Sequence, residues 1–110
     1  MMVNEFLTKE NWITGESALD DKDKPIPYYK YEAEKFDIKS AFRLHYKGEA
    51  YDEAVNRFKA AYKAAFPDKY KACRTVFDSF TGIRAIYPLY KLNDQLTFED
   101  LQRIFAITDV

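Results

Sequence analysis

The stretch Ala50–Phe66, AYDEAVNRFKAAYKAAF, decides the fold because it contains the clearest helical pattern of the sequence. Apolar side chains recur at helical spacing along its whole length, which is the signature of one buried helix face. This stripe comprises Tyr51, Ala54, Val55, Phe58, Ala61, Tyr62, Ala65 and Phe66. Polar residues such as Asp52, Lys59 and Lys63 fall off the stripe. We therefore expect one long amphipathic helix that packs against a core.

Further helical signals follow this stretch. Pro67 ends the long helix and suits the first turn of another. A second helix is predicted from the spacing of Tyr70, Cys73, Phe77 and Phe80, with Gly82 as its end. Ile83–Leu92, which Pro88 interrupts, is predicted to be a short helix or turn. Thr97 is placed to cap a last helix, since Glu99 and Asp100 put negative charge in its first turn. Its buried face is expected to contain Leu101, Ile104 and Phe105.

The part of the chain before the long helix gives weaker signals. Tyr31–Tyr46 has apolar residues at helical spacing, and Gly48 is placed as a C-terminal stop. Pro25 and Pro27 favour an extended surface loop over residues 20–28. Val3–Trp12 is expected to form a short helix. The sequence therefore predicts an all-α fold, a single compact bundle of four to six short helices that forms one domain over residues 1–110.

Composition narrows the classes of protein. The chain has 110 residues, of which 47% are hydrophobic and 32% charged, which is typical of a folded globular domain. One Cys and one His exclude a disulfide framework and a His/Cys zinc site. Three glycines provide no Gly-rich phosphate loop. We accordingly predict no cofactor, no metal and no enzymatic activity.

Two motifs are candidates for a chemical role, one as a calcium-binding loop and one as a nucleophile. Asp21, Asp23 and Glu32 have the spacing of a calcium loop, but Ile26 stands where the loop needs its sharp turn, so a solvated acidic loop is the preferred interpretation. Cys73 lies on an apolar stripe, which favours a buried and inert thiol over a nucleophile.

Charge is unevenly distributed along the chain. Residues 1–56 contain 12 acidic and 8 basic side chains, whereas residues 57–91 contain 8 basic and 2 acidic ones. Residues 92–110 are acidic again, with 4 acidic side chains and 1 basic one. The middle segment, Arg57–Lys91, is also interleaved with tyrosines, a combination that could follow a phosphate backbone or contact an acidic protein surface. A solvated lysine face over the helical core is the alternative.

This distribution predicts a continuous basic patch as the partner-binding site. We expect it to be formed by Arg57, Lys59, Lys63, Lys69, Lys71 and Arg74 and rimmed by Tyr87 and Tyr90. Aromatic residues make up 17% of the chain, more than a domain of this size readily buries. Tyrosines that face solvent are therefore expected among Tyr28, Tyr29, Tyr31, Tyr87 and Tyr90, either as binding surface or as the edge of the core.

Several short motifs resemble one family of proteins. They are Trp12-x-x-Gly15-x-x-Ala18, the spaced residues Ala33, Phe36 and Ala41, and Asn93-Asp94-x-x-Thr97-x-Glu99-Asp100-Leu101. Together they resemble a family of small helical proteins of unknown function from phage and actinobacterial genomes. The chain departs from that pattern where Asp37 follows Phe36, where Ser40 replaces a glycine and where Leu92 replaces a tryptophan. The resemblance implies a helical fold and a phage origin but no reaction.

We therefore expect a non-enzymatic protein-binding module, with a phage-encoded inhibitor of a host defence or replication complex as its narrower form. The alternative is a nucleic-acid-binding protein that uses the basic, tyrosine-interleaved face of Arg57–Lys91. A homo-oligomer is left open. Residues 1–12 lack the apolar run of a signal peptide and no segment has the length of a membrane span, so a cytoplasmic location is expected, that of the host if the protein is phage-encoded.

Overall fold

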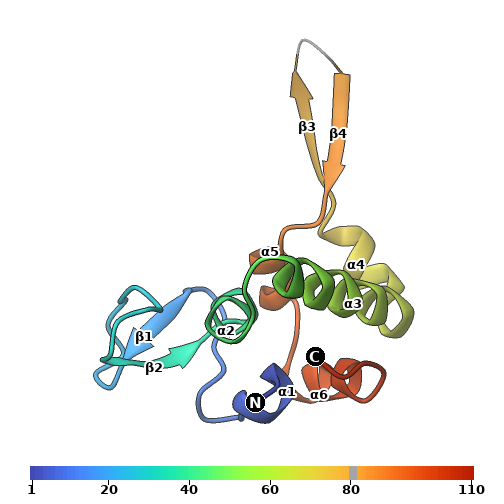
Figure 1. The fold of residues 1–110 in the computed structure, drawn as a ribbon. Coiled ribbons are helices and arrows are strands. Elements are labelled where there is room, and N and C mark those ends of the chain that lie inside the picture. Colours follow the sequence, from blue (N-terminus) through green and yellow to red (C-terminus); the bar gives the residue numbers. More distant parts are fainter. Residues whose placement is uncertain (80–81) are drawn as a thin grey trace.

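The long helix predicted from residues 50–66 forms the centre of the molecule as α3 (Glu49–Ala65). The computed structural model describes the backbone of residues 1–79 and 82–110 and the side chains of residues 1–75 and 86–110. Helices α2, α4 and α6 pack against α3. In chain order, the elements that accompany α3 are α1 (Val3–Phe6), β1 (Ala18–Asp20), β2 (Ala33–Phe36), α2 (Ile38–His45), α4 (Pro67–Ala72), β3 (Thr75–Ser79), β4 (Gly82–Ile86), α5 (Leu89–Asp94) and α6 (Phe98–Phe105) (Figure 1).

The molecule is mostly helical, but the prediction of a purely all-α bundle is wrong. The described residues contain six helices and two antiparallel sheets of two strands each. One sheet pairs β1 with β2, and the other is the hairpin of β3 and β4. Strands β2, β3 and β4 lie in segments that the sequence pattern predicted to be helix or turn, whereas β1 overlaps Trp12–Leu19, a segment whose poor alternation gave only a weak strand signal.

The predicted helix over Tyr31–Tyr46 is correct only in its second half. Asp37 caps α2 by accepting a hydrogen bond from the backbone N–H of Ser40 at 2.8 Å. A capping residue has extended backbone, so the helix cannot continue toward the N-terminus. The residues before it pair with β1 instead, with Ala18 opposite Phe36. A long-range pairing partner therefore overrides the helical spacing in β2.

The predicted helix through Tyr70, Cys73, Phe77 and Phe80 is wrong beyond Ala72, where α4 ends. The strands β3 and β4 follow, with Thr75 opposite Ile86 and Ser79 opposite Gly82. Phe80 lies outside the described residues. Each strand contains two β-branched residues, and β3 also contains Phe77, a composition that favours strand. The sequence pattern nevertheless predicted a helix, because Tyr70, Cys73, Phe77 and Phe80 are also spaced as on one face of a helix.

The prediction that Gly48 stops a helix is wrong, because this residue precedes a helix instead. Helix α2 already ends at His45, and Gly48 is the residue just before α3. Its backbone φ angle is +56°, a value that glycine adopts without steric cost. The glycine therefore makes the turn that joins the two helices.

Other local signals are confirmed. Pro67 occupies the first turn of α4, immediately after α3. Thr97 caps α6, and its side chain and that of Asp100 each accept a hydrogen bond from the other residue's backbone N–H at 3.1 Å. Leu101 and Ile104 are fully buried on the predicted face of α6.

The core lies between α2, α3, α5 and α6. Its largest fully buried side chains are Tyr62, Phe42 and Phe58. The ring of Phe58 contacts both neighbours, with centroids 5.5 Å from Phe42 and 6.0 Å from Tyr62. Tyr62 satisfies its buried hydroxyl by donating to the carbonyl oxygen of Leu92 at 2.9 Å. Aromatic packing therefore holds α3 against α2 and α5.

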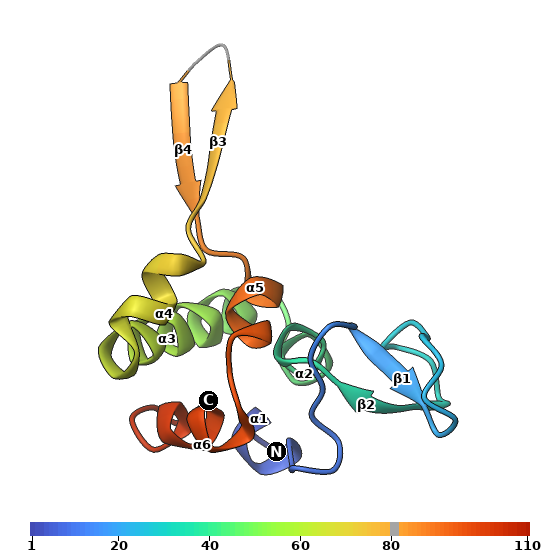
Figure 2. The ribbon, with the colours of Figure 1, turned by 180° about the vertical axis from the view of Figure 1, so that it is seen from behind.

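The two sheets lie outside this helical core. The β1–β2 sheet extends beside α2, and the β3–β4 hairpin projects away from the body near α4 and α5 (Figures 1 and 2). The two ends of the chain meet, since the backbone N–H of Asn4 donates to the carbonyl oxygen of Val110 at 2.9 Å. Among the described residues, no helix combines the length and apolar character needed to cross a membrane.

Candidate functional site

The hairpin is anchored to the body by side chains at its base. Tyr87, which follows β4, stacks on Tyr70 of α4 with ring centroids 4.2 Å apart and an interplanar angle of 19°. Lys91 of α5 donates from Nζ to Thr75 Oγ1 of β3 at 3.0 Å. Thr75 at the start of β3 and Tyr87 just after β4 thus tie the base of the hairpin to two different helices.

The hairpin presents unpaired backbone to its surroundings. Within the described residues each of its strands has a neighbour on one side only. The free edge of a strand offers N–H and C=O groups that another chain can pair with. Ile86, at the end of β4, exposes 45% of its surface. The hairpin is therefore a surface element suited to strand pairing.

The composition of the hairpin is apolar and electrically neutral. Residues 75–86 contain Val, Phe, Ile and Ala together with one acidic and one basic residue, Asp78 and Arg84. A two-stranded hairpin standing alone is marginally stable in water. A partner that covers the apolar residues would therefore stabilise the hairpin.

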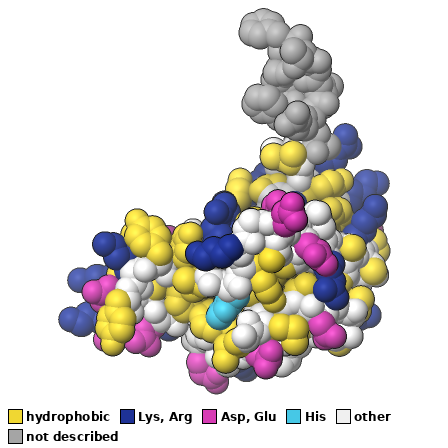
Figure 3. Space-filling model, in the orientation of Figure 1, with side chains coloured by type: hydrophobic (Ala, Val, Ile, Leu, Met, Phe, Trp, Pro, Cys, Tyr) yellow, Lys and Arg dark blue, Asp and Glu magenta, His cyan; other side chains and the backbone are white. Residues whose placement is uncertain are grey.

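Two basic residues lie next to this base, Lys71 in α4 and Arg74 between α4 and β3. Lys71 and Arg74 are exposed, and Figure 3 shows Lys and Arg side chains gathered over α4 beside the hairpin. Of the tyrosines predicted to rim the patch, Tyr87 lies at the base of the hairpin through its stack on Tyr70. The structure thus brings together Lys71, Arg74 and Tyr87.

Lys69 belongs to α4 but is occupied by contacts within the molecule. Its ammonium donates to Asp100 Oδ2 at 2.8 Å and to the carbonyl oxygen of Gln95 at 3.2 Å, and it lies 5.4 Å from the centroid of the Phe66 ring. The hydrogen bond from Lys69 is the main reason that the pKa of Asp100 is lowered. Lys69 therefore joins α4 to α6 and is the least available of the predicted basic residues.

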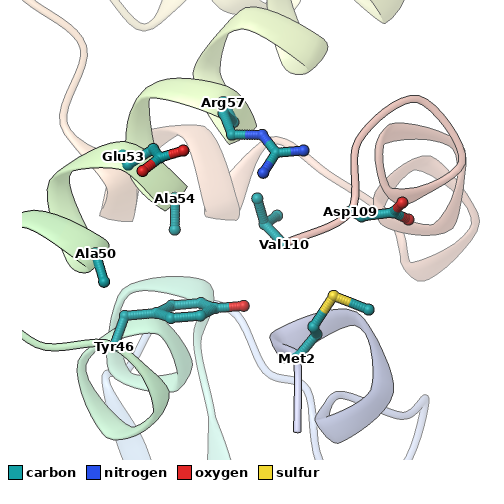
Figure 4. A pocket seen from close by; sticks show the side chains of 8 residues that line it. All are labelled: Met2, Tyr46, Ala50, Glu53, Ala54, Arg57, Asp109 and Val110. Atoms are coloured by element: carbon teal, nitrogen blue, oxygen red, sulfur yellow. The ribbon is translucent and has the colours of Figure 1, made fainter.

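Arg57 does not join the other basic residues. It lies about 200° around the helix axis from Lys59, so the two occupy opposite flanks of the buried stripe of α3. Figure 4 shows Arg57 beside a pocket of about 260 Å³ that also contains Met2, Tyr46 and Val110. The continuous six-residue patch that the sequence predicted is therefore divided.

Lys59 and Lys63 lie one turn apart on the flank of α3 away from Arg57. Lys63 is exposed, whereas Lys59 is half-buried and burial lowers its pKa. Tyr90 is 52% exposed and lines a different pocket with Asp37 and Asp94. Neither lysine nor Tyr90 contributes a contact at the base of the hairpin in the described residues.

The other predicted tyrosines divide by exposure. Tyr29 is 69% exposed and Tyr31 is 98% exposed, in agreement with the prediction, whereas Tyr28 and Tyr87 are half-buried. Cys73 is buried as predicted, and burial raises the pKa of its thiol. In the described residues no group of three His, Cys, Asp or Glu side chains has the arrangement of a metal site.

Sequence reasoning missed the hairpin, although local signals were present. The β-branched residues Thr75, Val76, Ile83 and Ile86, with Gly82 between the two pairs, indicate strands. Comparison with protein-family models, with curated proteins and with solved structures finds no match to this chain. The resemblance to a phage and actinobacterial family therefore stays a prediction.

Proposed function

We propose that this protein is a non-enzymatic protein-binding module that engages its partner through the β3–β4 hairpin and the basic residues at its base. The single observation that carries this proposal is the projection of the hairpin from the helical body (Figures 1 and 2). Its free edges can add strands to a partner sheet, and backbone pairing of this kind is a recurrent mode of peptide and protein recognition. Lys71 and Arg74 would speed the encounter with an acidic partner surface.

The composition of the hairpin favours a protein partner over nucleic acid. A two-stranded ribbon fits the major groove of DNA, but such a ribbon needs cations along its length to neutralise phosphates. Residues 75–86 carry one basic residue, Arg84, which Asp78 offsets. An apolar and neutral hairpin instead matches the desolvated centre of a protein interface, with charges kept at the rim.

A shortened hairpin tests the proposal. Because Thr75 and Ile86 are paired residues, replacing residues 76–85 by Asn-Gly closes the chain with a two-residue turn. We expect this variant to keep the helical circular dichroism and the melting temperature of the parent. A photo-crosslinking residue at Ile86 should capture a stoichiometric partner from host lysate in the parent, and the shortened protein should lose that partner in a pull-down.

The control places the same photo-crosslinking residue at Ala60, an exposed position on α3. Capture at Ala60 but not at Ile86, or equal recovery of the partner by parent and shortened protein, would place the interface elsewhere. The narrower proposal, inhibition of a host defence or replication complex by a phage protein, rests on the family resemblance and is tested by the identity of the captured partner.

Nucleic-acid binding is the second candidate, because Lys and Arg side chains gather over α4 (Figure 3). The two candidates differ in their dependence on salt, because binding driven by phosphate contacts weakens steeply as the salt concentration rises.

A further inference from the structure

A second site lies away from the hairpin, at the junction of α2 and α3. The turn through Gly48 leaves a pocket of about 350 Å³ between the end of one helix and the start of the next. That volume is within the range of small-molecule sites. The pocket is lined by Tyr28, Arg43, Tyr46, Lys47, Gly48, Tyr51 and Asp52.

Three tyrosine rings and two cations converge in this pocket. The guanidinium of Arg43 lies 5.1 Å from the centroid of the Tyr51 ring, so a cation–π contact holds it in place. Near the centre of Figure 3, Lys and Arg side chains gather over the junction of α2 and α3, next to hydrophobic side chains. An aromatic surface and fixed cations are thus side by side.

Among the described residues, no carboxylate lies within ion-pair distance of the two cations of the pocket. Ion pairs among the described residues join Lys35 to Asp23 and Lys69 to Asp100, so neither Arg43 nor Lys47 is neutralised by this part of the chain. The stacked guanidinium keeps its N–H edge available for hydrogen bonds. Asp52 also lines the pocket and opposes an anion, which leaves one net positive charge among the lining side chains.

The hydroxyl of Tyr51 adds a further hydrogen-bond donor to those of Arg43 and Lys47. Burial raises the pKa of Tyr51, against the lowering effect of Arg43, so this hydroxyl stays protonated at neutral pH. The pocket also lies at the N-terminal end of α3, where the helix dipole is positive. The two cations, the hydroxyl of Tyr51 and the helix terminus therefore all favour a negatively charged oxygen, and Asp52 opposes it.

We infer that the pocket between α2 and α3 binds a phosphate monoester carried on an aromatic ring. Arg43 and Lys47 contact the phosphate oxygens, and the Arg43 guanidinium can donate two parallel hydrogen bonds to them. The rings of Tyr28 and Tyr46 provide faces against which the ring of the ligand packs. Inorganic phosphate can contact Arg43 and Lys47 but has no ring to pack against the tyrosines, so it should bind more weakly than an aryl phosphate.

Titrations followed by backbone amide signals test this inference. Phenyl phosphate should shift the amide signals of Gly48 and Glu49 in a saturable manner, and inorganic phosphate and phenol should each bind more weakly. Phosphotyrosine, whose phosphate is also carried on an aromatic ring, should bind as phenyl phosphate does, whereas adenosine monophosphate, whose phosphate is carried on a ribose, should bind more weakly. Absence of a saturable shift at these amides would overturn the site, and equal affinity for inorganic phosphate would overturn its aromatic part.

Variants of the basic and of the acidic lining residues should change the affinity for phenyl phosphate in opposite directions. Arg43→Gln and Lys47→Gln should each weaken phenyl phosphate binding by about tenfold, the size expected for a lost charge-assisted hydrogen bond. Asp52→Asn should tighten binding, because it removes the opposing carboxylate. Lys63→Gln is the matched control, since it makes the same change of charge on α3 outside the pocket. If Lys63→Gln weakens binding as much as Arg43→Gln, only a general charge effect is present and the site is overturned.

Discussion

Asn93 connects three parts of the chain through one fully buried amide. Its Oδ1 accepts hydrogen bonds from Trp12 Nε1 at 2.7 Å and from the backbone N–H of Ile38 at 3.1 Å. Its Nδ2 donates to the carbonyl oxygen of Ile13 at 2.9 Å. Asn93, which belongs to one of the motifs that carry the family resemblance, thus has a structural role at the end of α5.

Asn93→Leu should therefore be strongly destabilising. The change leaves the N–H groups of Ile38 and Trp12 without their acceptor, and each unsatisfied buried group costs about 1–3 kcal/mol. We expect the free energy of unfolding, measured with urea, to fall by about 2–5 kcal/mol. The control is Asn56→Leu at an exposed position of α3, which should change it by less than about 0.5 kcal/mol. A similar small loss in both variants would contradict this role.

His45 predicts a dependence of stability on pH. Its ring packs against Phe6 with centroids 4.4 Å apart, and its Nε2 is buried without a hydrogen-bond partner among the described residues. Burial, and secondarily the positive amino terminus, lower its pKa. The unfolded state therefore binds the proton more readily than the folded state, so the folded state loses stability as pH falls through the unfolded pKa of about 6.5.

The measurement is the urea midpoint at about pH 7.5 and about pH 5.5, above the range in which ordinary carboxylates titrate. The parent should be less stable at the lower pH, and His45→Gln should show a smaller change. Since the chain has one His, no second imidazole obscures the comparison. An identical change in parent and variant would show that other groups cause it.

At the scale of elements, α6 depends on its capping box. Thr97 and Asp100 satisfy each other's backbone N–H groups, as described above, at a helix of only eight residues. Thr97→Ala removes the acceptor for the Asp100 N–H, and loss of an N-cap costs about 1 kcal/mol. We expect this decrease in the urea-derived free energy of unfolding, while Thr14→Ala, at an exposed loop position, should leave it within about 0.5 kcal/mol. Equal effects of the two variants would mean that the cap contributes little.

At the scale of the whole molecule, the distribution of charge separates the two proposed functions. Basic residues lie beside the hairpin, but Arg57 and Lys69 are removed from that surface and the formal net charge of the chain is −1. We therefore expect no saturable binding of a short DNA duplex or of single-stranded DNA or RNA near physiological ionic strength. Fluorescence anisotropy over a range of salt concentrations checks this.

Nucleic-acid binding would instead weaken by roughly one log unit per log unit of salt for each phosphate contacted. Reversal of Lys63, Lys71 and Arg74 to Glu, at exposed positions, should leave the melting temperature nearly unchanged. Tight binding of the parent with a steep salt slope that this triple variant abolishes would favour nucleic acid over a protein partner.

The sequence by itself determined the elements whose signals are local. The stripe of α3, Pro67 after it and the Thr97 cap of α6 each specify structure through residues within a few positions of one another. These features needed no knowledge of distant parts of the chain. Cys73 is buried as expected, but the helical stripe that predicted its burial does not continue beyond Ala72.

Only the tertiary structure decided the strands and the engagement of Lys69. Strand β2 forms because β1 lies beside it, and the two strands come from segments that a loop with two prolines separates. Lys69 leaves the predicted patch for the same reason, since Asp100 contacts it from near the far end of the chain. The separation of Arg57 from Lys59 instead follows from the local geometry of α3. Contacts between residues that are distant in sequence leave no periodic pattern in the sequence. Only the folded structure therefore shows which basic residues remain available to a binding partner.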